Sequence, residues 1–323
     1  MSSLPVLRAP LVTIRTATAA DHDALHDLDG AAADSGASLI QARRNFFSRM
    51  AAYDRTRVLV AEVERQVVGV QCLALTPVRV AGQPCSAGYS FNTRVAPSYQ
   101  TRGLGSQLLK AGAEWLERQG CRYVTGLIGV SNTASMKMVG ALGWEAVARF
   151  DYLILDLARF EPDAAVRIRK VDALGDPAHA AWRFGEVSLH HFVPRYLVSE
   201  LFTPYPKGPY MGSLTAFGPG GSAWVSLWDD RVRRGLDPDV VRAVKAYDLT
   251  LKGAGGFRAF SAIANVLREA GLDHVLMPLP HDPATRAVLD PYAAEIVEFN
   301  FVVKRLNGAE PLPPGPIYFD IRH

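Results

Sequence analysis

The sequence has little cysteine, almost no net charge and no long apolar run, and each absence excludes a class of protein. Its 323 residues include three cysteines, Cys72, Cys85 and Cys121, with no C-x-x-C spacing. This argues against a disulfide scaffold or a zinc knuckle and fits a reducing compartment. The excess of 35 lysine and arginine residues over 32 aspartate and glutamate residues is too small to indicate a nucleic-acid-binding surface.

No apolar run approaches the roughly 18 residues that a membrane span requires. The N-terminal segment carries Pro5 and Pro10 and lacks the apolar core of a signal peptide. We therefore expect a cytoplasmic protein with no membrane partner. The composition, 49% hydrophobic and 21% charged, is that of a globular chain, and the length favours about two domains.

Apolar periodicity and turn residues predict a mixed α/β unit in the first half of the chain. The predicted strands are 11–18, 57–63, 67–75, 87–95, 123–130 and 150–157. The predicted helices are 19–30, about 39–53, a helix that ends at Gly120, and a helix to Leu142 with Asn132 as its N-cap.

The second half repeats the first weakly. An offset of 151 residues aligns the segment 115–120 with 266–271 and Phe150 with Phe301. Because the offset is nearly constant across a helix, a glycine and a late strand, we predict a duplicated fold. The predicted units are residues 1–160 and 161–323.

The strongest chemical signal is the glycine-rich loop after the strand that ends at Val95. Gly103 and Gly105 open a helix there. Glycines let a backbone approach a ligand closely, and the unpaired N–H groups and dipole of a helix N-terminus attract anions. The loop therefore predicts a pyrophosphate site to which Arg102 and Ser106 add donors. A glycine-rich connection without a ligand is the alternative.

This stretch resembles motif A of the GCN5-related N-acetyltransferases (GNAT), V-x-P-x-x-[QR]-x-x-G-x-[GA]. The residues that fill its positions are Val95, Pro97, Gln100, Gly103 and Gly105. The family's second motif, N-x-x-A-x-x-x-Y-x-x-x-G-F, is similar to the segment from Asn132 to Trp144. The resemblance covers roughly residues 11–157 and implies an α/β fold with a mixed, mostly antiparallel sheet and helices on both faces. The fold would occur here twice, with a degenerate second copy.

The resemblance implies acetyl-CoA as co-substrate, no metal, and direct attack of an amine on the thioester. The backbone around Val95, where two parallel strands separate, would hold the thioester and the pantetheine arm, and an N–H there would act as an oxyanion donor. Asn132 would hydrogen-bond the arm, with Ser135 nearby. The residues assigned to the cofactor are Arg94, Val95, Gln100, Thr101, Arg102, Gly103, Leu104, Gly105, Ser106, Asn132 and Ser135.

Two positions depart from the family pattern. Val139 stands where the family has a general-acid tyrosine, and Tyr89 stands where it often has a general-base glutamate. Proton transfer needs a group within hydrogen-bond reach of the amine or one water away. The candidates are Glu62, Tyr89, Asn92 and Tyr152. The alternatives are a solvent-facing strand residue for Glu62 and a cleft wall for Tyr89.

The second half does not keep the ligand loop. At the offset of 151, Leu251 stands in the place of Gln100. Ala254 stands in the place of Gly103. We predict a second copy that does not bind CoA, with a second live acyl-CoA site as the alternative.

Together these features predict an acetyl-CoA-dependent N-acetyltransferase. Its expected acceptor is a small primary amine, such as an amino acid, amino sugar or antibiotic, because no basic patch or tail suits a macromolecular substrate. A protein N-acetyltransferase is the runner-up. A CoA-binding regulatory module without catalysis, favoured by Val139 and Tyr89, is the alternative from a different class. A homodimer is compatible with the sequence.

Overall fold

In this computed structural model, residues 11–30, 46–162, 165–171, 193–194, 210–229, 242–314 and 317 are described. The first part of the helix predicted at 39–53 lies outside them, and the rest is the 3₁₀ helix Phe46–Ala52. Among the described residues, no helix combines the length and apolar character needed to cross a bilayer.

The two halves contain the following elements. The first half holds β1 (Val12–Thr16), α1 (His22–Gly30), β2 (Thr56–Val63), β3 (Gln66–Val80), β4 (Gln83–Val95), α3 (Leu104–Arg118), β5 (Tyr123–Gly129), α4 (Thr133–Ala141) and β6 (Glu145–Asp156). The second half holds β7 (Arg167–Val171), β8 (Val193–Pro194), β9 (Tyr210–Gly218), β10 (Gly221–Trp228), β11 (Ala243–Lys252), α6 (Gly256–Glu269), β12 (His274–Pro280), α7 (Pro283–Leu289) and β13 (Ala293–Arg305).

The order of elements repeats between the halves. The series β1-β2-β3-β4-α3-β5-α4-β6 corresponds to β7-β9-β10-β11-α6-β12-α7-β13, with β8 as an addition that pairs with β3. The strand pairs on either side of the long helix are parallel in both copies, β4 with β5 and β11 with β12. The predicted duplication and mixed sheet are therefore confirmed.

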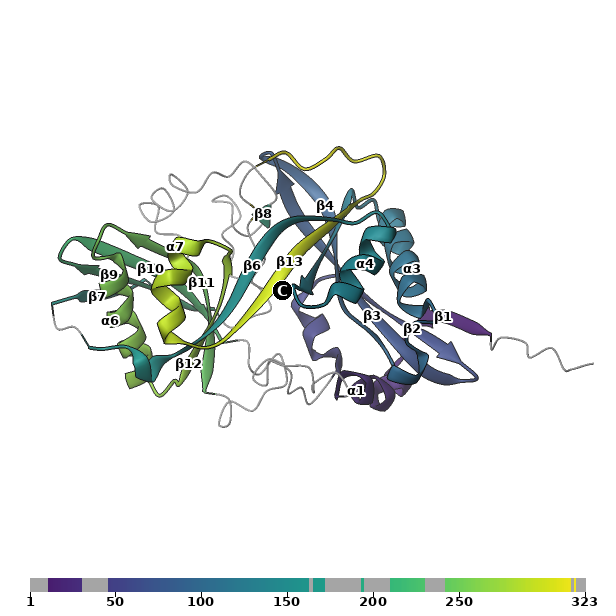
Figure 1. The fold of residues 1–323 in the computed structure, drawn as a ribbon, viewed down its shortest axis with the longest axis horizontal. Helices are drawn as coiled ribbons and strands as arrows, with labels where there is room; N and C mark the ends of the chain where they lie inside the picture. The colour runs from purple at the N-terminus through teal and green to yellow at the C-terminus, as the bar shows by residue number, and fades with distance from the viewer. Residues whose placement is uncertain are drawn as a thin grey trace, which may run out of the picture.

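All strands of the described residues form one continuous sheet. Its order is β1-β2-β3-β4-β5-β13-β6-β12-β11-β10-β9-β7, which runs across both halves of the molecule (Figure 1). Two long strands, β6 and β13, lie side by side at its centre (Figure 1).

The last strands of the two halves are exchanged. Strand β13 pairs with β5 of the first half, with Phe301 opposite Leu127. Strand β6 pairs with β12 of the second half, with Tyr152 opposite Pro278. The boundary predicted near residue 160 therefore does not divide the sheet.

Helices cover the first half of the sheet on both faces. Helices α3 and α4 pack on one face over a core that includes Leu108, Leu116 and Trp144. Helix α1 and the 3₁₀ helix Phe46–Ala52 pack on the other face, over a core that includes Val60 and Tyr89. The two faces of β4 thus pack against two different sets of helices.

Candidate functional site

Strands β4 and β5 separate part of the way along their length. They pair in parallel only from Ala87–Tyr123 to Tyr89–Thr125, although β4 continues to Val95. A β-bulge accompanies the separation, because the β3–β4 register shifts there and Asn92 adopts a left-handed φ of 50°. The structure thus has the separation of parallel strands that the resemblance implies before Val95.

The loop after β4 presents unpaired backbone donors. It turns through the 3₁₀ helix Pro97–Tyr99, and both Thr101 (φ 62°) and the N-cap Gly103 (φ 78°) are left-handed. The first intrahelical bond runs from Gln107 N to Gly103 O at 3.1 Å. Within the described part of the chain, the N–H groups of residues 101–106 have no hydrogen-bond partner. Such groups at the positive end of a 15-residue helix suit an anion.

The two glycines of the loop have different surroundings. A Cβ built at Gly103 would meet no atom within 4 Å, so the loop is open there. A Cβ at Gly105 would lie 3.0 Å from Met138 Sδ on α4, so Gly105 allows α3 and α4 to pack closely. Leu104 is 3% exposed and anchors the turn in the core. Only its backbone is therefore available to a ligand.

The side chains of the loop hold its shape. Gln100 Nε2 donates to Val95 O at 3.1 Å, and Thr101 Oγ1 donates to Gln100 O at 2.6 Å. The Arg102 guanidinium lies 5.2 Å from the Tyr99 ring centre, and Arg102 is exposed. The structure therefore brings the predicted residues from Val95 to Ser106 together, with Arg102 as the cationic side chain at the rim.

Arg94 points away from this loop. Its Nε lies 3.4 Å from Asp29 Oδ1 of α1, on the opposite face of the sheet from α3. The side chain therefore ties β4 to α1. The prediction that Arg94 serves the cofactor is not supported for the side chain.

Helix α4 begins as predicted. Asn132 caps it, with its Oδ1 accepting from Ser135 N at 3.0 Å. The cap uses the amide oxygen, so the exposed Asn132 amide nitrogen is the part that a pantetheine arm could contact. Val139 is 4% exposed and packs in the α3–α4 core, so no hydroxyl stands where the family has its tyrosine.

The carboxylate of Glu62 is already paired. It lies 2.7 Å from Arg15 Nη2, and the same guanidinium binds Asp21 at 2.8 Å. Hydrogen bonds from the Arg15 side chain hold the pKa of Asp21 well below its usual range, while burial opposes them. This charge network joins β1 and β2 to the start of α1, which argues against Glu62 as a general base.

Tyr152 belongs to the other half of the sheet. It lies on β6 opposite Pro278 and Val297, and Lys245 Nζ of β11 lies 5.8 Å from its ring centre. Strand β13 separates β6 from β5 in the sheet, so Tyr152 does not lie on a strand next to the separation of β4 and β5. The sequence places it in the first half, but the strand exchange carries it next to β12.

Tyr89 and Asn92 do come together, and Arg49 joins them. Arg49 donates to Tyr89 Oη and to Asn92 Oδ1, both at 3.4 Å. Its guanidinium lies 4.6 Å from the centre of the Phe91 ring, which stacks on Tyr89 at 4.9 Å. Burial alone would lower the pKa of Arg49, but Tyr89, Tyr53 and Cys72 raise it above its usual value. Nothing in the sequence singles out Arg49, since it lies in no motif.

The equivalent loop of the second copy is short and covered. Three residues, 253–255, join β11 to α6, and Leu251 lies within β11 rather than in a loop. Gly255 N donates to Gly220 O at 3.1 Å, in the β9–β10 turn. A Cβ at Gly255 would collide with Pro219 O, so the two backbones are in close contact. The β9–β10 turn therefore covers the place where the first copy presents its open loop.

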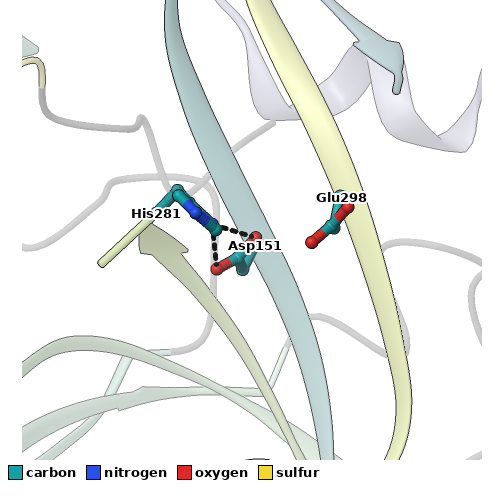
Figure 2. Close-up of side chains that lie close together, drawn as sticks. All are labelled: Asp151, His281 and Glu298. Atoms are coloured by element: carbon teal, nitrogen blue, oxygen red, sulfur yellow. Dashed lines mark hydrogen bonds and ion pairs between the residues drawn. The ribbon is translucent and has the colours of Figure 1, made fainter. Parts of the chain in front are cut away.

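A cluster of charged side chains, Asp151, His281, Glu298 and Arg286, joins the two exchanged strands. His281 Nδ1 lies 2.9 and 3.1 Å from the two oxygens of the buried Asp151 (Figure 2). Ligand atoms of Asp151, His281 and Glu298 lie within 4.8 Å of one another, as in a metal site. However, Arg286 Nη1 contacts both carboxylates, at 3.1 Å each, and so takes the place of a cation between them. We interpret the cluster as an ion-pair network. No sequence motif predicts it.

Comparison with known proteins agrees with this geometry. Residues 25–144 match the acetyltransferase (GNAT) family model, and this segment includes the open loop and all of α4. None of the curated proteins matches the chain in sequence.

Solved structures share the fold of the whole chain at low identity. A tandem GNAT protein from the clavulanic acid biosynthesis pathway is 15% identical with a TM-score of 0.58, over 93% of this chain and 100% of that chain. A GCN5-related N-acetyltransferase from Sphaerobacter thermophilus is 12% identical with a TM-score of 0.54, over 95% and 98% of the two chains. A fungal glucosamine N-acetyltransferase region within a multi-domain β-N-acetylglucosaminidase is 11% identical with a TM-score of 0.61, over 92% of this chain and 38% of that chain.

Proposed function

Because the first unit is a domain of the GNAT family and the whole chain has the tandem GNAT fold, we propose that this protein is an acetyl-CoA-dependent N-acetyltransferase with a small primary amine as acceptor. The first copy binds acetyl-CoA, and the second copy binds none. The cytoplasm is its proposed location.

The observation that carries the proposal is the run of unpaired N–H groups from Thr101 to Ser106 beside the separation of β4 and β5. The N–H groups and the helix dipole of α3 would bind the pyrophosphate, with Arg102 adding a positive charge. The pantetheine arm would lie along β4, between α3 and the Asn132 cap. When bound, acetyl-CoA supplies a thioester that an amine can attack.

Among the predicted acid–base residues, Tyr89 and Asn92 are the ones that lie at the strand separation. Tyr89 is the last β4 residue paired with β5, so its position is held by the sheet. We assign Tyr89 the transfer of the amine proton to water. Val139 cannot protonate the thiolate, so the leaving group takes its proton from solvent. On this basis Tyr89→Phe should lower kcat about 10²-fold, within the usual range for a general acid or base.

The test is release of free CoA thiol from acetyl-CoA with a panel of amines. Amine-dependent release in the wild type, with little release in buffer alone, is the expected result. CoA binding without amine-dependent release from any amine would overturn the enzyme proposal. It would instead support a CoA-binding regulatory module without catalysis, which the buried Val139 favours. Acetylation of peptide N-termini in preference to small amines would support a protein acetyltransferase.

A further inference from the structure

Arg49 lies at the strand separation, and no carboxylate of the residues that the structure describes pairs with it. Its hydrogen-bond acceptors are Tyr89 Oη and Asn92 Oδ1, both neutral and both at the long distance of 3.4 Å. Within the described residues, no ion pair involves Arg49. Other arginines of the same unit do have one, since Arg94 pairs with Asp29 and Arg15 with Asp21 and Glu62.

An unpaired guanidinium in a half-buried position is unusual, because a charge removed from water needs compensation. The rings of Phe91 and Tyr89 supply part of it, with the guanidinium 4.6 and 5.9 Å from their centres. These rings hold the guanidinium against β4. They offer no negative charge, so the N–H groups of the fork are left with weak partners.

A second unmatched donor lies beside it. The amide nitrogen of Asn92 is buried and has no hydrogen-bond partner in the described part of the chain, while its amide oxygen accepts from Arg49. Asn92 also occupies the left-handed position of the β-bulge, a strained conformation that is frequent at functional sites. Buried polar groups without partners are rare in native structures, and they indicate a missing partner.

An anionic oxygen would therefore serve as a hydrogen-bond acceptor for both donors. A carboxylate fits the planar fork of an arginine and accepts from an amide N–H group at the same time. The donors lie on the α1 face of β4, whereas the pyrophosphate loop belongs to the α3 face. An anion at Arg49 is thus separate from the phosphates of CoA.

Building on the proposed function, we propose that Arg49 and Asn92 bind a carboxylate of the acceptor, so the acceptor is an amino acid-like primary amine. Amino sugars without an acidic group and polycationic antibiotics lack a carboxylate. The carboxylate would fix the amine end of the acceptor relative to the thioester, which makes Arg49 a positioning and specificity residue.

The experiment measures binding of matched ligand pairs to the CoA-loaded protein by calorimetry. The pairs are the twenty standard amino acids and their α-carboxamides, together with β-alanine and phosphoethanolamine. For at least one pair, the carboxylate should bind about 10- to 100-fold more tightly than the amide, as expected for hydrogen bonds to a charged group.

Arg49→Met should abolish this preference and leave the affinity for acetyl-CoA unchanged. Arg49→Lys should keep part of the carboxylate preference, because lysine retains the positive charge but lacks the planar guanidinium. The matched control is Arg57→Met, since Arg57 also stacks on an aromatic ring (5.1 Å from the centre of Trp115) but on β2. Thermal melting of each variant reports whether it folds.

The outcomes separate this inference from the proposed function. Equal binding of acids and amides, no binding of any acid, or an unchanged preference in Arg49→Met would each overturn the carboxylate site. Tighter binding of phosphoethanolamine than of β-alanine would also overturn it, in favour of a phosphate. Amine-dependent thiol release can still occur in all these cases. Conversely, a carboxylate preference without thiol release would uphold the site and overturn the enzyme.

Discussion

Asp151 on β6 and Glu298 on β13 lie directly opposite each other, and the guanidinium of Arg286 contacts both carboxylates. Like charges opposite each other destabilise a sheet, so the arginine offsets a repulsion that the strand register creates. Because β6 comes from the first half of the chain and β13 from the second, the interaction joins the two halves at the centre of the sheet.

Removal of Arg286 should therefore destabilise the whole molecule. Arg286→Met leaves Asp151, whose side chain is 1% exposed, with His281 as its remaining partner. We expect a loss of about 3–5 kcal/mol in the free energy of unfolding, measured by urea denaturation. Arg118→Met is the control, because the Arg118–Glu114 pair is exposed and should contribute less than about 1 kcal/mol. Equal losses of unfolding free energy in the two variants would contradict the stabilising role of Arg286.

Gly103 should be essential for binding acetyl-CoA but not for folding. Gly103→Val places a β-branched residue at φ 78°, so the loop must change its backbone conformation. We expect the affinity for acetyl-CoA to fall by at least about 10-fold, as several charge-assisted hydrogen bonds are lost. Gly120→Val is matched, because Gly120 has φ 77° and open space at the other end of α3. If both variants lost affinity equally, the loop would not be the site.

The chain should bind one molecule of acetyl-CoA. The N-terminus of α6 has a loop of three residues, and the turn at Gly220 lies against it. A pyrophosphate there would have to displace backbone that is already hydrogen-bonded. Calorimetric titration should give a stoichiometry near one for the wild type and no measurable site for Gly103→Val. A stoichiometry of two would show that the second copy is a live site.

The stability contributed by Asp21 should depend on pH. Hydrogen bonds from Arg15 lower the pKa of this carboxyl in the folded state. A lowered folded-state pKa gives stability that is present above the unfolded value of about 4 and is lost as the pH falls toward the folded value. Asp21→Asn should cost about 1–3 kcal/mol at pH 7, and the difference from the wild type should shrink below pH 4. The exposed Asp23→Asn is the control, and a difference that does not vary with pH would contradict the argument.

Features that depend on neighbouring residues could be predicted from the sequence. Asn132 caps α4, and Gly103 opens α3, because caps and left-handed turns are properties of a few adjacent residues. The turn at Glu64 and Arg65 is also local, with φ of 51° and 66°, which suits a two-residue hairpin.

Features that depend on residues far away in the sequence could not be predicted from it. The alternation of β6 shows that it is a strand but not whether it pairs with β5 or β12, so the pairing of Tyr152 with Pro278 and Val297 could not be predicted. Glu62 illustrates the same limit, because its partner Arg15 is 47 residues away. Arg49 lies in a segment with no motif, and it becomes informative only when Asn92 is seen beside it.

The exchange of β6 and β13 also sets the order in which the molecule can be completed during synthesis. The edge of β5 is covered by residues 299–305, so the first unit cannot close its sheet until nearly the whole chain has left the ribosome. Until then β5 carries an unpaired edge of the kind that recruits other strands. Arg305 pairs with Tyr123 across most of the second half, and contacts of such long sequence separation form slowly. The residues of the proposed acetyl-CoA site therefore lie early in the sequence, but the sheet that holds them is completed last.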